Sequence, residues 1–259
     1  MTLLRDYTNQ ARTYDETRAA SPSVVGPLRE ALAGAPGRRL ADIGGGTGNY
    51  AEALRDDGWD PVVIDREPAM LARAAAKGLE TVEADAQRLP LPDAGFDAVM
   101  LVSMLHHVED PAAALAEAQR VLRPGGHLAL MVFTREDTEH SWLSDYFPST
   151  RAWLLETHST RAELLALLPG ARQIPVLFRD LEDGSLAALS AFPEKIVDPA
   201  WHRQTSYFER LERDHPDQMR AGLARLRADI AAGRAPRRPG LASVLAWAKT
   251  PPATSTAAG

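Results

Sequence analysis

The stretch LADIGGGTG, residues 40–48, decides the fold of this chain. Its apolar start predicts a buried strand from Leu40 to Ile43, and the amphipathic residues Tyr50 to Leu54 predict a helix directly after the turn. Glycines at such a junction allow a tight turn and let a ligand lie against bare backbone. The unpaired N–H groups that open the helix provide polar contacts for the same ligand. The pattern therefore predicts a ligand site between a strand and a helix.

Short apolar runs alternate with amphipathic stretches around this turn. This alternation is typical of βαβ units, whose right-handed crossovers build a doubly wound sheet with helices on both faces. Asp110 and Pro111 predict the start of one crossover helix, which Pro124-Gly125-Gly126 is expected to end. We expect an α/β fold with a mostly parallel, seven-stranded, Rossmann-like sheet and helical lid insertions. The strands are expected at residues 40–43, 61–64, 80–84, 96–102, 128–133, 173–178 and 241–249.

The glycine spacing argues against a dinucleotide. The dinucleotide fingerprint G-x-G-x-x-G, counted from Gly44, would need glycine where Asn49 stands. Asp42 lies two positions before the first glycine, where a carboxylate would repel a pyrophosphate but would suit a ligand that carries an ammonium group. A nicotinamide oxidoreductase is therefore the weaker interpretation.

Two further acids follow the next strands along the chain. Asp65 ends the second strand, and a carboxylate there can accept hydrogen bonds from both hydroxyls of a ribose. Asp85 and Ala86 follow the third strand, where an adenine amino group could be bound. Asp85 taken alone could equally be a helix cap. Three acids at three successive strand ends favour a nucleoside-like ligand.

The run from Leu40 to Thr134 resembles the class I S-adenosylmethionine methyltransferases, specifically their ubiquinone/menaquinone-type branch. Beyond Thr134 there is only a loose similarity to actinobacterial secondary-metabolism methyltransferases. The motifs that carry the resemblance are Ala41 to Gly48, Val63-Ile64-Asp65, Glu83 to Ala86 with Leu89-Pro90, Phe96 to Val99, Leu105 to Val108 and Leu122 to Gly126.

The resemblance implies S-adenosylmethionine as cofactor and assigns roles to matching residues. The methionine portion would lie against Asp42, Gly44 and Gly46, and its ammonium group near the backbone of Val102 and Ser103. Asp65 would bind the ribose and Arg66 would lie beside the adenine, which Asp85 and Ala86 would hold. Tyr14-Asp15-Glu16-Thr17-Arg18 is similar to a helix that covers the cofactor in this family, which places Tyr14 over the cofactor.

Methyl transfer needs an aligned acceptor and, for some acceptors, a general base. His106 and His107 follow the fourth strand at the expected site of the methyl group, and His107 is the preferred base. A simple packing turn is the alternative for both histidines.

Tyr7 lies seven residues before Tyr14, on the same face if residues 3–19 are helical, and is placed nearer the acceptor. His158 is a second candidate base. A metal site is not expected, because no histidine pair or acid cluster of the usual spacing accompanies these residues.

The chain is divided into four parts. Residues 1–133 are expected to hold an N-terminal helix and the cofactor core, 134–240 the lid and acceptor-binding insertions with the sixth strand, 241–249 the final strand, and 250–259 a disordered tail. Aromatic residues concentrate in the lid, which favours a flat aromatic acceptor such as a phenol or an indole. The candidates for acceptor contact are Trp142, Tyr146, Phe147 and Trp153, which could instead form an ordinary core.

Composition limits the alternatives. The chain has 259 residues, no cysteine and a net charge of −6. The acidic balance argues against nucleic-acid partners, and the missing cysteines exclude disulfides and thiolate chemistry. With no apolar stretch near membrane length and no signal peptide, a cytoplasmic protein acting on a small molecule is expected, with oligomeric state open. A non-catalytic subunit or sensor that binds the cofactor stays an alternative.

Overall fold

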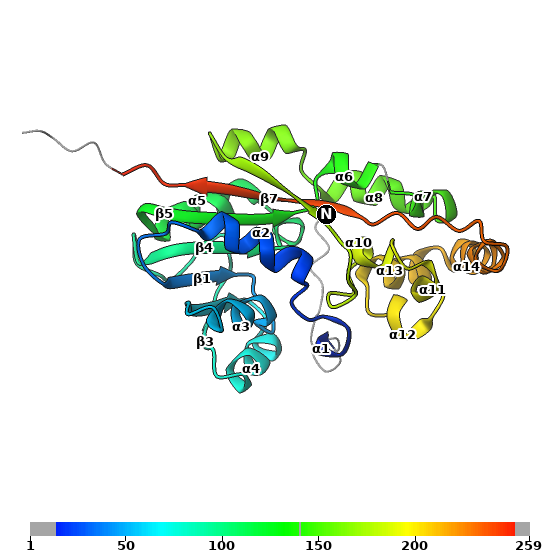
Figure 1. Ribbon diagram of the computed structural model, residues 1–259, viewed down its shortest axis with the longest axis horizontal. Helices are drawn as coiled ribbons and strands as arrows, with labels where there is room; N and C mark the ends of the chain where they lie inside the picture. Colours follow the sequence, from blue (N-terminus) through cyan, green and yellow to red (C-terminus); the bar gives the residue numbers. More distant parts are fainter. Residues whose placement is uncertain (1–13, 140, 252–259) are drawn as a thin grey trace, which may run out of the picture.

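A seven-stranded sheet forms the centre of the computed structural model, which describes residues 14–139 and 141–251 (Figure 1). The strand order is β3-β2-β1-β4-β5-β7-β6, and only β7 runs against its neighbours. This arrangement confirms the predicted α/β, doubly wound class. The strands are β1 (Arg39–Ile43), β2 (Asp60–Asp65), β3 (Glu80–Glu83), β4 (Phe96–Val102), β5 (Leu122–Val132), β6 (Arg172–Leu177) and β7 (Leu241–Ala248).

Helices cover both faces of the sheet because side chains alternate along each buried strand. On β1, Leu40 packs into one core with α2, α3 and α4, whereas Ala41 packs into the other core with α5 and α9. The covering helices are α2 (Pro22–Leu32), α3 (Asn49–Arg55), α4 (Pro68–Ala76), α5 (Pro111–Val121) and α9 (Arg161–Leu167).

The α5–β5 connection differs from the expectation in one respect. Asp110 caps α5 as predicted, accepting hydrogen bonds from Ala112 N at 2.9 Å and Ala113 N at 3.1 Å. Strand β5, however, begins at Leu122, so Pro124-Gly125-Gly126 lies inside the strand rather than in a turn before it. The ladder absorbs these residues through a register shift opposite Phe96 and Ala98.

The remaining helices gather beyond the carboxyl ends of the parallel strands, at the right of Figure 1, and we call them the lid. Three of them follow β5 and five follow β6. Residues 199–231 form three separate helices, the last of which begins at Pro216, a residue suited to the first helical turn. The lid helices are α6 (Arg135–Glu139), α7 (Leu143–Tyr146), α8 (Ser149–Thr157), α10 (Leu186–Leu189), α11 (Pro193–Ile196), α12 (Pro199–His202), α13 (Ser206–Asp214) and α14 (Pro216–Ala231).

The N-terminal segment joins the sheet to the lid. Helix α1 (Tyr14–Thr17) ends before residue 19, the expected helix end, because Arg18 pairs as an isolated bridge with Asp183. Ala19 N donates to Glu182 O at 2.6 Å, and Gly184 N donates to Thr17 O at 2.7 Å. We call residues 14–19 the strap.

None of the described helices combines the length and the apolar character that crossing a membrane requires.

Candidate functional site

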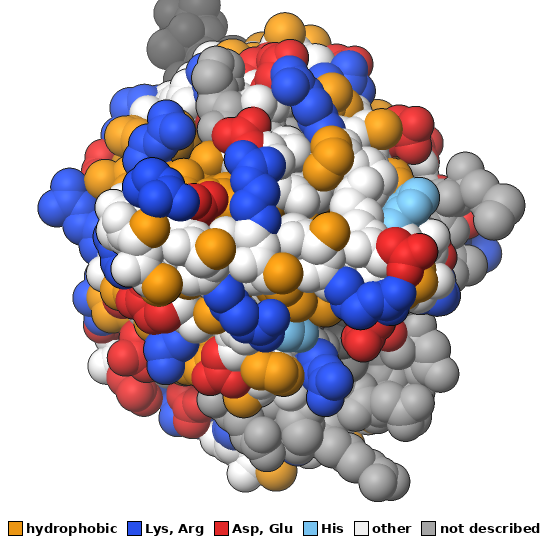
Figure 2. All heavy atoms as spheres, turned by 90° about the vertical axis from the view of Figure 1, so that its right-hand side faces the viewer, with side chains coloured by type: hydrophobic (Ala, Val, Ile, Leu, Met, Phe, Trp, Pro, Cys, Tyr) orange, Lys and Arg blue, Asp and Glu red, His pale blue; other side chains and the backbone are white. Residues whose placement is uncertain are grey.

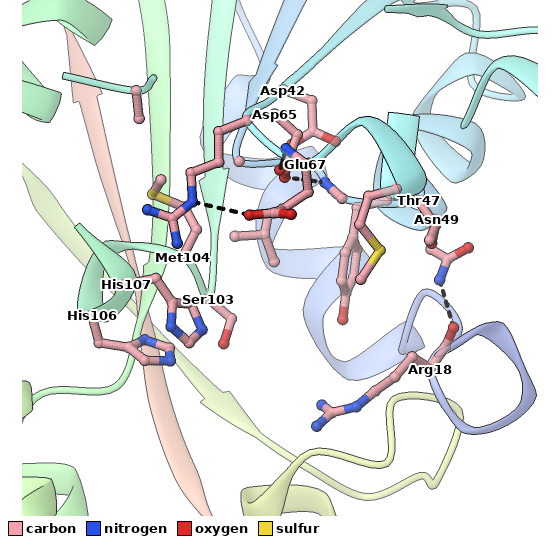
Figure 3. A pocket seen from close by; sticks show the side chains of 18 of the residues that line it. Arg18, Asp42, Thr47, Asn49, Asp65, Glu67, Ser103, Met104, His106 and His107 are labelled. Carbon is pink, nitrogen blue, oxygen red and sulfur yellow. Dashed lines mark hydrogen bonds and ion pairs between the residues drawn. The ribbon is translucent and has the colours of Figure 1, made fainter. Parts of the chain in front are cut away.

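A cavity opens at the carboxyl ends of β1, β2 and β4, beside the loop after β3 (Figure 3). The sequence motifs that predict cofactor contacts are far apart in the chain, and the parallel sheet brings them to this one edge. The predicted residues that line the cavity are Asp42, Gly44, Gly46, Asp65, Arg66, Asp85, Ala86, Val102 and Ser103.

The glycine turn after β1 has no room for side chains at two positions. A Cβ on Gly44, whose φ is +71°, would lie 2.8 Å from the side chain of Met104, and a Cβ on Gly45 would lie 2.4 Å from Asp42 Oδ2. Gly46 has φ +56° and open space where its side chain would be. The turn therefore presents bare backbone to the cavity.

Asp42 is the buried acid of the site, with only 1% of its surface exposed. Its Oδ1 has no hydrogen-bond partner. Burial, together with the negative charge of Asp65, raises the pKa of Asp42 to about 8. A buried carboxylate oxygen without a partner is costly, and a cationic ligand group would satisfy it. This position fits the ammonium group of an amino-acid ligand portion.

Asp65 is held in place by two backbone groups. Gly46 N donates to its Oδ2 and Glu67 N to its Oδ1, both at 2.9 Å. A carboxylate has about four acceptor positions, so both oxygens can still accept hydrogen bonds from a vicinal diol. Glu67 also lines the cavity and pairs with Arg66 at 3.5 Å. Sequence reasoning missed Glu67, although it follows the strand-end acid by only two residues.

Asp85 holds a turn instead of capping a helix, and its role toward an adenine stays a prediction. It lines the cavity, and its Oδ1 accepts a hydrogen bond from Gln87 N at 2.9 Å, which fixes the turn after β3. The Gln87 side-chain amide lies 3.1 and 3.2 Å from the two carboxylate oxygens. Asp85 is thus a turn residue whose exposed carboxylate also faces the site.

Ser103 turns the chain at the end of β4. Its φ of +52° is unusual for a residue with a side chain, and Ser103 N donates to Met131 O at 3.0 Å, which holds the turn. The short helix η1 (Leu105–His107) follows directly and directs His106 and His107 at the cavity (Figure 3). Nothing in the sequence around Ser103 signals this conformation.

Three histidines form a cluster that the sequence did not connect. The His106 ring lies 4.0 Å from His107 and 5.1 Å from His158, with which it stacks, measured between ring centroids. His158 comes from the end of α8, and its Nδ1 lies 2.8 Å from the carbonyl oxygen of Leu154. Because that carbonyl only accepts, Nδ1 carries the proton and Nε2 keeps its lone pair. Burial lowers the pKa of His106 and that of His158.

A second cavity of about 1180 Å³ lies between the histidine cluster and the lid. Ser103, His106 and His107 line both cavities, so the two meet at the end of β4. Trp142 and Trp153 line the second cavity, where the sequence placed an acceptor.

The assignment of Tyr146 and Phe147 to the acceptor site is corrected by the structure. Neither lines either of the two cavities described above, because both pack in the core of the lid. The Phe147 ring is fully buried, edge-on to Phe208 at 5.2 Å, and Tyr146 Oη donates to Asp229 Oδ2 at 2.9 Å. These rings stabilise the lid.

Neither tyrosine assignment is tested by the described part of the structure. Tyr7 lies outside the described residues. Tyr14 lies in α1, but its side chain is outside the described part of the structure.

The strap is fastened to the glycine turn by Asp15, which sequence reasoning did not single out. Asp15 Oδ1 accepts hydrogen bonds from Thr47 Oγ1 at 2.6 Å and Asn49 Nδ2 at 3.1 Å. Its Oδ2 accepts a hydrogen bond from Arg73 Nε at 3.1 Å. Lys77 Nζ lies 3.5 Å from Asp15 Oδ1. The strap therefore closes one side of the first cavity, which Arg18 lines.

Within residues 14–139 and 141–251, no group of three or more histidine or acidic side chains is placed to hold a metal ion.

Comparisons with known proteins match this chain to methyltransferases. Residues 41–130 match a family described as a methyltransferase domain. A demethylmenaquinone methyltransferase from Renibacterium salmoninarum is 35% identical over 131 residues, which are 50% of this chain and 54% of that relative. The chain thus spans about half the length of the curated relatives it matches.

Solved structures match over more of the chain. A protein from Anabaena variabilis, provisionally described as a methyltransferase from an antibiotic biosynthesis pathway, is 25% identical with a TM-score of 0.76, covering 88% of this chain and 98% of that one. A phosphoethanolamine N-methyltransferase from Haemonchus contortus, solved with phosphomonomethylethanolamine and S-adenosylhomocysteine, shares the fold at 14% identity. Its TM-score is 0.59, over 95% of this chain and 58% of that chain.

Proposed function

We propose that the chain is a class I S-adenosylmethionine-dependent methyltransferase, similar to the quinone methyltransferases, and that it methylates a small molecule bound in the lid cavity. The acceptor is an aromatic or heteroaromatic metabolite of the phenol or indole type. The observation that carries the proposal is the buried, unpartnered Asp42 oxygen beside a bare glycine turn, next to an aromatic cavity. The two cavities meet where the methyl group has to pass.

The residues of the first cavity suit each part of the cofactor. Asp42 and the backbone of Gly44 and Gly46 would hold the methionine portion, while Asp65 would bind the ribose hydroxyls. The adenine would lie between Arg66 and the loop of Asp85 and Ala86, with the backbone of Val102 and Ser103 near the ammonium group. When bound, the cofactor supplies a methyl group on a positively charged sulfur, which is already a strong electrophile.

The chain's own task is to position the acceptor, exclude water and take up a proton. His107 is the proposed base, with His158 as the second candidate. The Leu154 carbonyl holds the proton on His158 Nδ1, so that Nε2 is the nitrogen that can accept one. Because burial lowers the pKa of His106, that ring stays neutral between the two candidates and does not repel a proton from them.

The aromatic acceptor rests on the lining of the second cavity. Phe133, Trp142 and Trp153 line it, and flat aromatic ligands stack on such side chains. Turnover of aliphatic acceptors alone would contradict this part of the proposal.

The experiment is a calorimetric titration with S-adenosylmethionine, S-adenosylhomocysteine and NADH, on the wild-type protein and on Asp65→Ala. We expect both adenosyl ligands to bind and Asp65→Ala to weaken them about ten- to hundredfold, as the loss of charged hydrogen bonds predicts. Binding of NADH in their place would favour an oxidoreductase.

Turnover is measured next, with labelled methyl groups and a panel of phenols and indoles. His107→Ala and His158→Ala are both expected to keep cofactor binding. The variant that lacks the general base should transfer the methyl group about 10²- to 10⁴-fold more slowly. Cofactor binding without methylation of any acceptor would favour a sensor or a non-catalytic subunit.

A further inference from the structure

Arginine side chains of the lid region are mostly paired with acids. Figure 2 shows the face that lies at the right of Figure 1, where blue basic side chains lie beside red acidic ones. Asp229 pairs with Arg234 at 2.8 Å, and Glu194 pairs with Arg237 at 3.0 Å. The same holds for most arginines that line the second cavity.

Three of these cavity arginines are occupied by a carboxylate. Arg18 pairs with Asp183 at 2.8 Å, and Arg213 pairs with Asp214 at 2.7 Å. Arg210 lies 3.5 Å from the same Asp214 and stacks over the Trp153 ring at 4.2 Å. A fourth, Arg238, is exposed to solvent.

Arg135 differs from the others. It is partly buried and lines the cavity at the start of α6, directly after β5. Its Nε is buried and has no hydrogen-bond partner; the same is true of Arg18 and Arg210, but each of those two has an acid as ion-pair partner. Within the described residues, no ion pair or side-chain hydrogen bond engages its guanidinium. A partly buried cation in this condition is stabilised by an anionic ligand.

Nearby acids are engaged elsewhere. Asp137 Oδ2 accepts hydrogen bonds from Thr134 N at 3.0 Å and from Thr134 Oγ1 at 2.8 Å. Glu163 completes the capping box of α9, accepting from Thr160 N at 2.7 Å. Both carboxylates therefore hold the backbone instead of Arg135.

Arg135 also lies beside the reacting end of the cavity. Arg135 N donates to the carbonyl oxygen of Ser159 at 3.0 Å, which joins the start of α6 to the residue after His158. The Phe133 ring packs edge-on to His158 with 6.4 Å between centroids. Phe133, Arg135 and His158 all line this cavity, so an apolar ring, a guanidinium and a proton acceptor face the same space.

We propose that the acceptor is an aromatic carboxylic acid whose carboxylate binds Arg135 while its ring lies against Phe133 and its nucleophile faces the histidine cluster. A planar guanidinium binds a carboxylate through two parallel hydrogen bonds, which also fixes the ligand's orientation. A carboxylate suits this site better than a phosphate, because no lysine is among the described residues that line the cavity and Arg135 is the one partly buried arginine there without an acid partner, which matches a single negative charge. This inference rests on the proposed function and specifies its substrate class.

The test measures binding to protein saturated with S-adenosylhomocysteine. The probes are matched pairs, indole-3-carboxylate with indole-3-carboxamide and 4-hydroxyphenylacetate with 4-hydroxyphenylacetamide, titrated calorimetrically. We expect the wild-type protein to bind the acids about ten- to hundredfold more tightly than the amides, as a charged hydrogen-bonded pair predicts. Arg135→Gln should abolish this preference by weakening the acids alone, and Arg135→Lys should restore only part of it.

Arg238→Gln is the matched control, because it removes a cavity arginine that is exposed to solvent. Equal affinity for acids and amides, no measurable binding of either acid, or an Arg238→Gln effect as large as that of Arg135→Gln would overturn the inference. Titration of the cofactor product into each variant comes first. If it binds normally while the acids show no preference, only the substrate class is wrong; if it does not bind, the proposed function fails as well.

Discussion

At the scale of single residues, Asp42 lowers the stability of the ligand-free protein while it provides a binding partner for a cationic ligand group. Its carboxylate is buried, has an oxygen without a partner and lies close to the charge of Asp65, so ionisation is unfavourable until a cation arrives. The folded protein raises the pKa of Asp42 from 3.8 to about 8. Between these two values the folded state binds a proton that the unfolded state does not bind. Unfolding free energy therefore falls as pH rises through this window.

We predict that Asp42→Asn removes this pH dependence. The melting temperature of the ligand-free variant should depend less on pH between about pH 5 and about pH 8. At the upper end of this range the variant should melt at a higher temperature than wild type, by about 2–4 °C for each kcal/mol of unfolding free energy that it gains. The same variant should lose affinity for S-adenosylmethionine. If the melting temperatures of variant and wild type changed with pH to the same extent across this window, Asp42 would not be the group responsible for the pH dependence.

The residues that could be predicted from sequence are those whose role is local. Asp42, Gly44 and Asp65 belong to short motifs at strand ends, and the parallel sheet brings such ends to one edge whatever the rest of the chain does. His158 is different, because 51 residues separate it from His107 and only lid packing places the two in one cluster. Ser103 adopts a positive φ for which its residue type gives no signal.

At the scale of elements, the strap depends on one carboxylate. Burial alone would raise the pKa of Asp15, but hydrogen bonds from Thr47, Arg73 and Asn49 and the charge of Lys77 lower it below its ordinary value. The ionised form of Asp15 is therefore the one that fastens α1 to the glycine turn. It loosens only as pH falls below the usual range of an aspartate.

We predict that Asp15→Asn speeds release of S-adenosylhomocysteine by about three- to tenfold, the effect of weakening one partly buried charged cluster. Stopped-flow displacement measures the rate. Asp57→Asn is the control, since it breaks the exposed pair of Asp57 with Arg29 after the end of α3, whereas the strap contacts lie at the start of that helix. Equal release rates in the two variants would mean that the strap does not retain the cofactor.

The lid helices show where aromatic content misleads. Aromatic enrichment indicates that a segment packs, but the sequence does not tell which ring faces a cavity and which faces a helix. Phe147 is fully buried, and a Cβ on Gly222 of α14 would lie only 2.4 Å from its ring. Trp153 lines the cavity instead, with Arg210 over its face. The two rings should therefore respond differently to truncation.

We predict that Phe147→Ala destabilises the protein by about 3–5 kcal/mol, the usual cost of removing a buried ring. Trp153→Ala should shift the melting temperature much less but raise KM for the acceptor. Thermal melting and steady-state kinetics on both variants make the comparison. A large loss of stability in Trp153→Ala with unchanged KM would place that ring in the core as well.

Element boundaries were predictable where a single residue type fixes them. Asp110 and Pro111 begin α5 as expected, whereas the start of β5 is wrong by six residues, because strand pairing with β4 incorporates the Pro-Gly-Gly run. Propensity marks a turn there, but the pairing of neighbouring strands overrides it.

At the scale of the whole molecule, three parts of the chain meet at Asp183. Its Oδ1 pairs with Arg18 of the strap at 2.8 Å, and its Oδ2 accepts a hydrogen bond from Tyr50 of α3 at 3.0 Å. Asp183 itself lies between β6 and the lid helix α10. The similarity to methyltransferases rests on motifs of the sheet, whereas this junction depends on residues 133 positions apart. No local motif could have predicted it.

Because both cavities share residues and the strap joins them, cofactor and acceptor binding should be coupled, and any such coupling is reciprocal. We predict that S-adenosylhomocysteine slows hydrogen exchange in the wild-type lid, notably in peptides covering α10 to α13, as well as around the glycine turn. In Asp183→Asn the protection should stay at the glycine turn but be lost from the lid, and the cofactor product should no longer raise acceptor affinity. Asp198→Asn is the matched control, since Asp198 only caps α12 through Ala200 N at 2.9 Å. Lid protection that survives in Asp183→Asn, or that is lost equally in Asp198→Asn, would show that the two sites communicate by another route or not at all.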